Sequence, residues 1–380
     1  MKIEGEWIRA RGVQEVLGLL NGAGHAAYLV GGCVRNALLG HPVSDIDIAT
    51  DAEPSRVTDL AGRAGLKVVP TGIDHGTVTI VVDGAPHEVT TFRRDVETHG
   101  RRATVAYSTR IEDDAARRDF TMNALYADAS GSVIDPLGGH EDLRARRVRF
   151  VGAADARIGE DYLRILRFFR FHAWYGDDTE GLDAEGLAAC AANSHGLDTL
   201  SRERVGHEMR RLLDAPDPVS AVAAMRATGV LARVLPGADD TALGPLVHLE
   251  PPYAPDWIRR LAALGGQDVE ERLRLSREEA RRLGDLRTGI SSGAGIDELA
   301  YRLGAEAARD LALLRAALFG TAMPDGWEVA VATGAAAVFP VRADDLLPAV
   351  QGAALGKHLR DLEARWIASG FELSREQLLA

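Results

Sequence analysis

The stretch that decides the fold is LVGGCVRNALLGHPVSDIDIAT, residues 29–50. It begins inside a short apolar run, and this run predicts a strand over about 26–32 that ends in two glycines. A short helix is expected from about residue 35 to 39. The last six residues, 45–50, alternate polar and apolar side chains as a half-buried strand does. A strand, a glycine turn, a short helix and a second strand therefore follow one another directly.

Both ends of this stretch carry residues suited to phosphate chemistry. Glycines at 31 and 32 let backbone N–H groups approach a phosphate chain, and the helix start that follows favours anions. Arg35 is expected to be a further phosphate contact. Asp45 and Asp47 stand two apart in the predicted strand, so their carboxylates should project from the same face. Because paired carboxylates suit hard cations such as Mg²⁺, a triphosphate site should face a metal site here.

Hairpin signals continue the first domain. Segments 77–82 and 88–92 flank an Asp-Gly pair at 83–84, which is typical of a tight hairpin. A second hairpin is expected around 129–131. Two-metal phosphoryl transfer usually recruits a third carboxylate from a neighbouring strand, and Glu88 is the candidate, with a charge on an exposed strand face as the alternative.

A polar region follows these strands. Residues 93–108 contain four arginines and little apolar periodicity, which predicts a loop. Residues 117–124, RRDFTMNA, are expected to present phosphate and ribose contacts from one helix. Their candidate contacts are Arg117, Asp119 and Asn123.

The segment 160–174, EDYLRILRFFRFHAW, has helical periodicity with an apolar face. Asp161 and Arg164 would share one face of this helix, about one turn apart. The simpler interpretation is a surface ion pair between them. In the functional interpretation they form a protein-made Watson–Crick edge. The carboxylate would accept from the amino group of cytosine or adenine, and the guanidinium would donate to their ring acceptors.

Strand signals fade after about residue 155, and helical patterns follow at 202–213, 218–228, 276–286, 298–319 and 356–369. The predicted fold class is therefore α+β. A head with a mixed, largely antiparallel sheet should precede an all-helical remainder.

Composition narrows the class of protein. The 380 residues carry 56 acidic and 44 basic side chains, a formal net charge of −12, which argues against a nucleic-acid partner. Two cysteines are too few for a disulfide scaffold and fit a reducing compartment. No secretory leader is expected at the start, and no apolar run is long enough to span a membrane.

The chain resembles the class II tRNA nucleotidyltransferases (CCA-adding enzymes) of the polymerase-β-like superfamily, close relatives of bacterial poly(A) polymerases. The matching stretches are residues 29–50, 117–128, 135–143, 160–171 and 200–209, with a weaker likeness at 354–371. This resemblance implies a catalytic head at 1–147, a base-selecting neck at 148–215, a helical body at 216–300 and a tRNA-binding tail at 301–380.

The resemblance also implies an activity and the roles of the site residues. Such an enzyme adds CCA to the 3′ end of tRNA from CTP and ATP, releases pyrophosphate, uses two Mg²⁺ ions and works in the cytoplasm. The implied roles are metal binding for Asp45, Asp47 and Glu88; triphosphate binding for Gly31, Gly32 and Arg35; nucleotide binding for Arg117, Asp119, Asn123, Asp161, Arg164 and Arg167; and RNA binding for Arg204 and Lys357.

Some features leave alternatives open. Asn36 stands where the family commonly has aspartate, which removes one charge beside the phosphate site. An A-adding enzyme would share nearly all of these motifs. CC-adding enzymes are associated with a shortened loop after the first motifs, and the full-looking segment 93–108 argues against one. Poly(A) polymerase stays open, although residues 65–79, GLKVVPTGIDHGTVT, lack the basic stretch characteristic of that enzyme. A tRNA partner also reverses the inference from net charge, because affinity depends on where positive charge gathers. Arginine clusters at 93–102, 117–118, 144–149 and 164–170 therefore predict a polarised surface.

Overall fold

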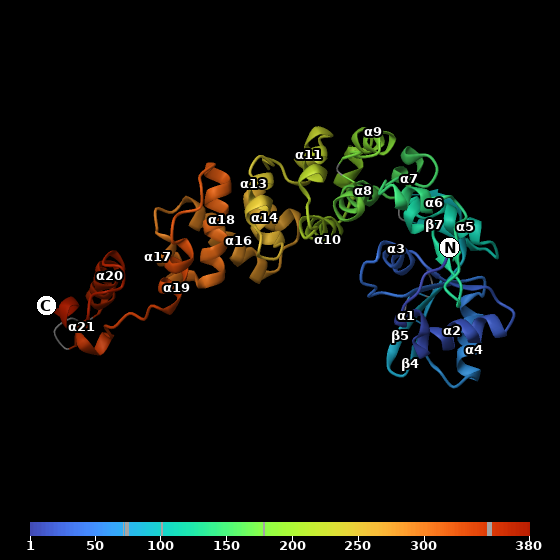
Figure 1. Cartoon of the computed structure of the whole chain (residues 1–380), viewed down its shortest axis with the longest axis horizontal. Helices are drawn as coiled ribbons and strands as arrows, with labels where there is room; N and C mark the ends of the chain where they lie inside the picture. The colour runs from blue at the N-terminus through green and yellow to red at the C-terminus, as the bar shows by residue number, and fades with distance from the viewer. Residues whose placement is uncertain (71, 73–75, 100–101, 178, 348–351) are drawn as a thin grey trace. The chain divides into compact units, whose positions relative to one another are not determined.

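The computed structural model describes residues 1–380 except 71, 73–75, 100–101, 178 and 348–351 (Figure 1). The chain divides into two compact units, Met1–Val234 and Leu235–Ala380. The finer division into head, neck, body and tail remains a prediction. None of the described helices is long and apolar enough to cross a membrane.

A seven-stranded sheet in the order β3-β4-β5-β2-β1-β8-β9 organises the first unit. Its strands are β1 (Ala27–Val30), β2 (Asp47–Thr50), β3 (Lys67–Val69), β4 (Thr77–Val82), β5 (Ala85–Thr91), β8 (Tyr126–Ala127) and β9 (Val133–Ile134). β2 and β5 pair in parallel, and the other neighbours in this sheet pair antiparallel. The mixed, largely antiparallel sheet and both hairpins are therefore confirmed. At the β4–β5 turn, Asp83 and Gly84 both have positive φ, 49° and 84°, as a type I′ turn requires.

The expectation of a loop over 93–108 was wrong. β6 (Arg93–His99) and β7 (Arg102–Tyr107) pair antiparallel as a separate two-stranded sheet. Their register shifts between Asp95 and Glu97. An extra residue at such a bulge breaks the two-residue alternation, which explains why the pattern did not read as a strand.

Helices cover this sheet and continue the first unit. They are α1 (Glu6–Arg9), α2 (Arg11–Gly22), α3 (Gly32–Leu39), α4 (Pro54–Arg63), α5 (Ile111–Ala116), η2 (Thr121–Asn123), α6 (Gly139–Arg144), α7 (Ala154–Glu160), α8 (Leu163–Tyr175), α9 (Ala184–Ala192), η3 (Ser194–Thr199), α10 (Arg202–Leu213), α11 (Val219–Ala227) and α12 (Val230–Val234). Two sequence expectations need correction. Residues 117–124 are not one helix: 117–120 link α5 to the short 3₁₀ helix η2, which covers 121–123. The predicted helix 160–174 is interrupted at Asp161.

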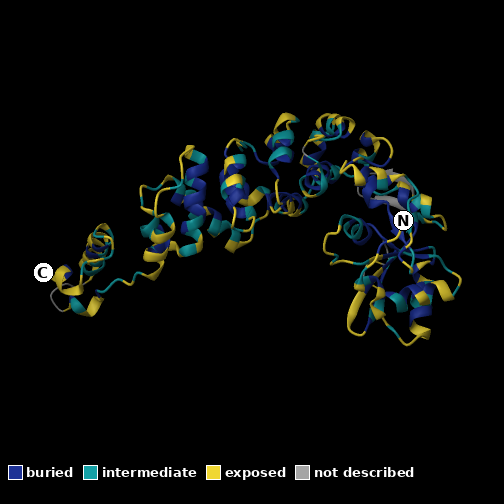
Figure 2. Cartoon of the chain, viewed as in Figure 1, coloured by how far each residue is buried: buried dark blue, intermediate teal, exposed yellow. Residues whose placement is uncertain are grey.

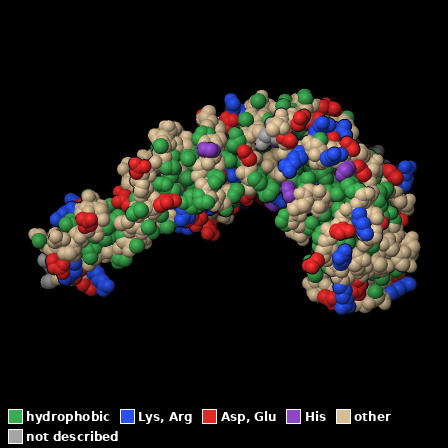
Figure 3. All heavy atoms as spheres, viewed as in Figure 1, with side chains coloured by type: hydrophobic (Ala, Val, Ile, Leu, Met, Phe, Trp, Pro, Cys, Tyr) green, Lys and Arg blue, Asp and Glu red, His purple; other side chains and the backbone are tan. Residues whose placement is uncertain are grey.

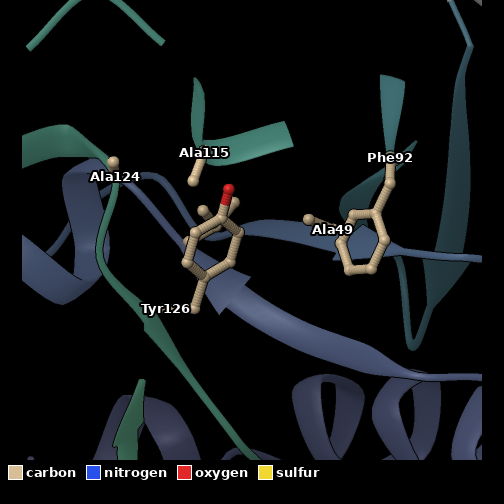
Figure 4. Packing of buried hydrophobic residues seen from close by; sticks show 6 residues of the cluster. Ala49, Phe92, Ala115, Ala124 and Tyr126 are labelled. Carbon is tan, nitrogen blue, oxygen red and sulfur yellow. The ribbon is translucent and has the colours of Figure 1, made fainter. Parts of the chain in front are cut away.

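Most residues of β1 and β2 are buried, and Asp47, the first residue of β2, is exposed (Figure 2). Ala49, Phe92, Ala115, Ala124 and Tyr126 pack in one cluster from strands and turns far apart in the sequence (Figure 4). The Tyr126 hydroxyl points out of this cluster and donates to the buried carboxylate of Asp114 at 2.8 Å. The apolar core therefore also anchors a charged side chain.

The second unit is built of helices, and the structure describes no strand within it. They are α13 (Leu243–Leu249), α14 (Trp257–Leu264), α15 (Val269–Arg272), α16 (Arg277–Ser291), α17 (Ile296–Leu303), α18 (Ala305–Phe319), α19 (Trp327–Ala336), η4 (Ala343–Asp345), α20 (Ala353–Ala368) and α21 (Arg375–Leu379). The single helix expected over 298–319 is two helices, because Gly304 adopts φ 88° between them. The α+β class holds for the whole chain.

Candidate active site

One cavity of about 330 Å³ in the first unit collects most of the polar motif residues. The start of α3, the segment before β2, the turn after α5 and two helices, α8 and α10, form its walls. The lining residues are Gly31, Gly32, Cys33, Arg35, Asn36, Ser44, Asp45, Asp47, Arg118, Asp119, Asn123, Arg167, Arg170, Phe171, Tyr175 and Arg211.

Two glycines shape the first wall. Gly31 adopts φ 74° as the residue before α3, and its backbone N–H donates to the carbonyl of Leu125 at 3.1 Å. A Cβ atom at this position would lie only 3.2 Å from Nη1 of Arg118. The backbone angle therefore favours glycine, and a side chain at this position would also displace the Arg118 guanidinium by a few tenths of an ångström. The turn places the positive end of α3 on the cavity, as the sequence predicted for a phosphate site.

Arg35 lies just behind this turn and is almost fully buried. Its guanidinium donates to Oδ1 of Asn123 at 2.5 Å and to the hydroxyl of Tyr175 at 2.8 Å. It also lies 4.1 Å from the centroid of the Tyr175 ring. Burial lowers the pKa of Arg35, and the nearby Tyr175 and Asp119 oppose this shift. Arg35 therefore links the start of α3 to the end of α8.

The departure at Asn36 changes charge but keeps a hydrogen-bond acceptor. Oδ1 of Asn36 accepts from Nε and Nη2 of Arg35 at 3.2 and 3.0 Å. Its Nδ2 donates to the carbonyl of Pro42 at 3.0 Å, in the segment that leads to Asp45. The amide thus orients Arg35 as a carboxylate would, while leaving its positive charge uncompensated at this contact.

The two predicted metal carboxylates do not both belong to a strand. Asp47 is the first residue of β2, whereas Asp45 precedes it and accepts from Ser44 Oγ at 3.1 Å. The alternation argument for a shared strand face was therefore wrong for Asp45, although both side chains line the cavity. The run DIDIAT looks uniform in sequence, but only its last four residues have a strand partner.

Glu88 stands directly beside Asp47, because the parallel pairing of β2 and β5 puts these two residues in register. Partial loss of water around Asp47, and then the negative charges of Glu88 and Asp45, raise the pKa of Asp47, while Arg118 lowers it. Negative charge is therefore concentrated at the start of β2. The described residues contain no set of three or more histidine, cysteine or acidic side chains close enough together to hold a metal ion.

The Arg-Arg-Asp motif is divided between two roles. Arg118 lines the cavity, and Arg117 does not. Asp114, at the buried end of α5, pairs with Arg118 at 2.9 Å and lies 3.7 Å from Arg117. Burial alone would lower the pKa of Arg118, but the Asp114 carboxylate offsets this effect and the net pKa is raised. Arg118 is therefore the permanently charged member that faces the cavity.

Asp119 is held by three donors. Asn123 Nδ2 and the backbone N–H of Phe120 donate to Oδ1 at 2.9 and 2.8 Å, and Arg167 Nε donates to Oδ2 at 2.7 Å. Burial would raise the pKa of Asp119, yet the Arg167 charge and these donors hold it below its usual value. The carboxylate is thus ionised at neutral pH, with its orientation fixed.

Asp161 and Arg164 do not form the ion pair that their spacing allows. Asp161 is extended, with φ −154°, and its Oδ1 accepts from the backbone N–H of Leu163 at 3.1 Å. Its Oδ2 accepts from Arg204 at 2.6 Å, while Arg164 pairs with Glu160 at 2.5 Å. The prediction that both lie on one helix face was wrong, because Asp161 is the residue at which the helix breaks.

The cavity divides the predicted site residues into two groups. Those on its walls are Gly31, Gly32, Arg35, Asp45, Asp47, Asp119, Asn123 and Arg167; those outside its lining are Glu88, Arg117, Asp161, Arg164, Arg204 and Lys357. Lys357 is exposed on α20 in the second unit.

Sequence reasoning missed several wall residues: Asn36 as an Arg35 partner, Ser44, Arg118, Arg170, Phe171, Tyr175 and Arg211. The spacing of Arg164, Arg167 and Arg170 was visible in the sequence, whereas Arg211 lies in no matching stretch.

Many arginines of the predicted basic clusters are neutralised by carboxylates. Arg118 pairs with Asp114, Arg149 with Asp142 at 2.8 Å, and Arg170 with Glu208 at 2.6 Å. Figure 3 shows basic and acidic side chains intermixed on the face drawn. Positive charge therefore does not form one uninterrupted band on that face.

Comparison with known proteins places these features in a family. Residues 27–149 match the family described as "Poly A polymerase head domain", and residues 182–241 match "Probable RNA and SrmB- binding site of polymerase A". The CCA-adding enzyme of Geobacillus thermodenitrificans is 40% identical over 255 residues, which are 66% of this chain and 58% of that protein. Human mitochondrial CCA tRNA nucleotidyltransferase 1 is 42% identical over 190 residues, 50% of this chain and 44% of that protein. The matches thus span about half the length of these curated relatives.

A solved structure covers more of the chain. The Bacillus stearothermophilus CCA-adding enzyme, crystallised with CTP, is 31% identical, with a TM-score of 0.74 over 96% of this chain and 94% of that one. Glycine turn, paired aspartates and arginine-lined cavity are thus found in a chain that follows this enzyme over nearly its whole length. The chain belongs to the CCA-adding enzyme family of tRNA nucleotidyltransferases.

Proposed function

We propose that the chain adds CCA to the 3′ end of tRNA from CTP and ATP, without a nucleic-acid template. The observation that carries this proposal is the single cavity in which the Gly31 turn, Asp45, Asp47 and a set of arginines meet. In this reaction the 3′ oxygen of the tRNA forms a bond to the α-phosphorus of the nucleotide. The bond between the α-phosphorus and the β-phosphate oxygen breaks, and pyrophosphate leaves.

The side chains present suit distinct parts of the nucleotide. The start of α3, Arg35 and Arg118 provide N–H donors and positive charge for the triphosphate. The fixed carboxylate of Asp119 and the amide of Asn123 can orient the sugar. Asp161 and Arg164 would read the base once they leave their present partners, Arg204 and Glu160.

Mg²⁺ is the proposed metal, and Asp45 and Asp47 would hold it with Glu88 as the neighbouring carboxylate. The donor chemistry fits, because carboxylate oxygens are the ligands that Mg²⁺ prefers. The raised pKa of Asp47 fits as well, since a cation would relieve the repulsion from Glu88 and Asp45. When bound, such ions act as Lewis acids that stabilise the charge developing on the transferring phosphoryl group.

Poly(A), A-only and CC-only addition are the competing activities. Poly(A) addition stays a candidate because residues 27–149 match a poly(A) polymerase head domain. The paired strands β6 and β7 occupy the region whose shortening is associated with CC-adding enzymes, which favours a reaction that proceeds to the final A. The cytoplasmic location expected from the sequence stays a prediction.

Product length separates these activities. Purified protein is supplied with Mg²⁺, CTP and ATP, and with tRNA transcripts that end before CCA, after C or after CC, together with an unrelated RNA. CCA addition predicts gains of three, two and one nucleotides on the tRNAs and none on the unrelated RNA. Long adenosine tails on every RNA would instead identify a poly(A) polymerase, and extension of only some tRNA ends would identify a partial activity.

A further inference from the structure

Arg211 brings a third helix to the nucleotide cavity. It lies in the last turn of α10 and lines the same cavity as the Gly31 turn and Asp47. Its backbone carbonyl accepts from the indole Nε1 of Trp174, near the end of α8, at 2.6 Å. This contact ties the end of α10 to α8, so the position of Arg211 relative to the cavity is fixed by tertiary packing.

The charges around Arg211 are unequal. Arg167 is paired with Asp119, and Arg170 is buried against Glu208 at 2.6 Å. Arg211 is exposed and forms no ion pair with any carboxylate among the described residues. Burial lowers the pKa of Arg170. The Glu208 carboxylate opposes this shift, and the positive charges of Arg167 and Arg211 add to it. The wall formed by α8 and α10 therefore carries a positive charge, on Arg211, that no carboxylate in the described part of the chain pairs with.

We propose that Arg211 binds the β- or γ-phosphate of the incoming nucleotide. The α-phosphate must lie near Asp45 and Asp47 if these residues hold the metals, so the rest of the triphosphate lies along the other walls of the cavity. A guanidinium fork suits two phosphate oxygens, and Arg211 has its fork available. The proposal rests on the proposed function and adds a contact from outside the stretches that carry the family resemblance.

The test measures nucleotide binding without tRNA and without turnover. CTP and CMP are titrated calorimetrically in Mg²⁺ buffer into the full chain and into Arg211→Ala, Arg211→Lys and Arg210→Ala. Arg210 is the matched control, since it is the adjacent arginine on α10 and does not line the cavity. We expect CTP to bind Arg211→Ala about 10-fold or more weakly, the scale for a lost hydrogen bond to a charged group.

Other arms of the experiment separate the explanations. CMP, which lacks the β- and γ-phosphates, should bind Arg211→Ala as it binds the unaltered chain, and Arg211→Lys should recover part of the CTP affinity. Equal losses for CTP and CMP, or a CTP affinity that Arg211→Ala leaves unchanged, would overturn the assignment. Failure of the unaltered chain to bind CTP would overturn the proposed function itself. The urea midpoint of Arg211→Ala should match the unaltered chain, since the Arg211 guanidinium is exposed and makes no hydrogen bond or ion pair with the described residues.

Discussion

Arginines meet carboxylates in both units, but with opposite relations to the surface. In the second unit Arg259 and Arg260 are buried with Glu250 and Asp310, each at most 4% exposed. Arg260 pairs with Glu250 at 2.7 Å, and Arg259 pairs with Asp310 at 2.8 Å and with Glu250 at 2.9 Å. In the first unit, by contrast, Arg35, Arg118 and Arg211 lie on the wall of a cavity.

The difference shows how the same residue types serve structure or binding. A guanidinium enclosed with its carboxylates has its donors used, so the pair contributes to folding or to its specificity. A guanidinium on a cavity wall that pairs with no carboxylate of the described residues, as Arg211 does, keeps its donors and charge for a ligand. Changes in the cavity should therefore affect chemistry and binding, while changes in the enclosed network should affect stability.

The largest effect is expected at the paired aspartates. Asp47→Asn and Asp45→Asn should each lower nucleotide incorporation at least about 10⁴-fold, the scale for loss of a group that acts in the transition state. Incorporation of labelled CMP into tRNA lacking CCA measures the loss, and filter binding of tRNA should change little. Incorporation near the unaltered rate by either variant would remove the metal role from that aspartate.

Glu88 provides the matched comparison at this site. Because Glu88 is in register with Asp47 but outside the cavity lining, Glu88→Gln should reduce incorporation by less than either aspartate change. A loss as large as that of Asp47→Asn would make Glu88 an equal partner in metal binding. An unchanged incorporation rate would show that Glu88 has no role in metal binding and is only a charge on an exposed strand face.

The buried ion pairs of Arg259 and Arg260 with Glu250 and Asp310 should show the reverse pattern: their loss should lower stability and leave nucleotide binding unchanged. Glu250→Gln leaves Arg260 without its buried counter-ion, which should lower the free energy of unfolding by about 3–5 kcal/mol. Urea unfolding followed by tryptophan fluorescence measures this, and CTP affinity should stay unchanged. Glu298→Gln, in an exposed pair with Arg302, is the control and should cost less than about 1 kcal/mol. Equal costs would show that burial does not distinguish the two pairs.

A smaller effect, on nucleotide preference, is expected at Asp161 and Arg164, the proposed base readers. Asp161→Ala and Arg164→Ala should each narrow the preference for CTP and ATP over UTP and GTP by about 1–3 kcal/mol, the value of an unmatched polar group. Competition assays with all four nucleotides measure it. Arg204→Ala removes the arginine that now pairs with Asp161. This variant should keep the preference for CTP and ATP over UTP and GTP, but the affinity of the enzyme for nucleotide should change. Unchanged preference in both of the first two variants would exclude them as base readers.

The smallest effect is on the pH dependence of stability. The folded-state pKa of Asp47 is raised, so the folded chain holds this proton more tightly than the unfolded chain. The stability contribution of Asp47 therefore falls as pH rises from its unfolded pKa through the raised value. Asp47→Asn should gain a few tenths of a kcal/mol over the unaltered chain across this window, because solvent screens the exposed carboxylate.

Asp119 should show the opposite sign. Its folded-state pKa is lowered, so its contribution to stability is present above the unfolded value and is lost as pH falls through the lowered pKa. Urea midpoints of Asp47→Asn and Asp119→Asn, measured from about pH 3 to about pH 8, compare the two. The same slope in both variants would contradict the charge environments described for the cavity.

Local patterns were enough for much of the fold and for part of the site. The glycine turn before α3, the Asp83-Gly84 hairpin and the bounds of α10 follow from neighbouring residues alone, because turns and helices are stabilised by contacts within a few residues. The paired aspartates were also recognisable, since their spacing is itself the signal. The bulge that conceals β6 and the break at Asp161 were not. The bulge breaks the two-residue alternation that marks a strand, and Asp161 is held by Arg204, 43 residues away.

The sequence by itself therefore determined the family, the α+β class and the residues that are candidates for the chemistry. Tertiary structure decided which of them share one cavity. It set Asp47 beside Glu88 through a parallel strand pair, and it placed Arg118 rather than Arg117 on the wall of the cavity, paired with the buried carboxylate of Asp114. It also brought Arg211 to the site through α8 and α10. The reason is that register and packing depend on contacts between elements far apart in the chain, which no local pattern encodes.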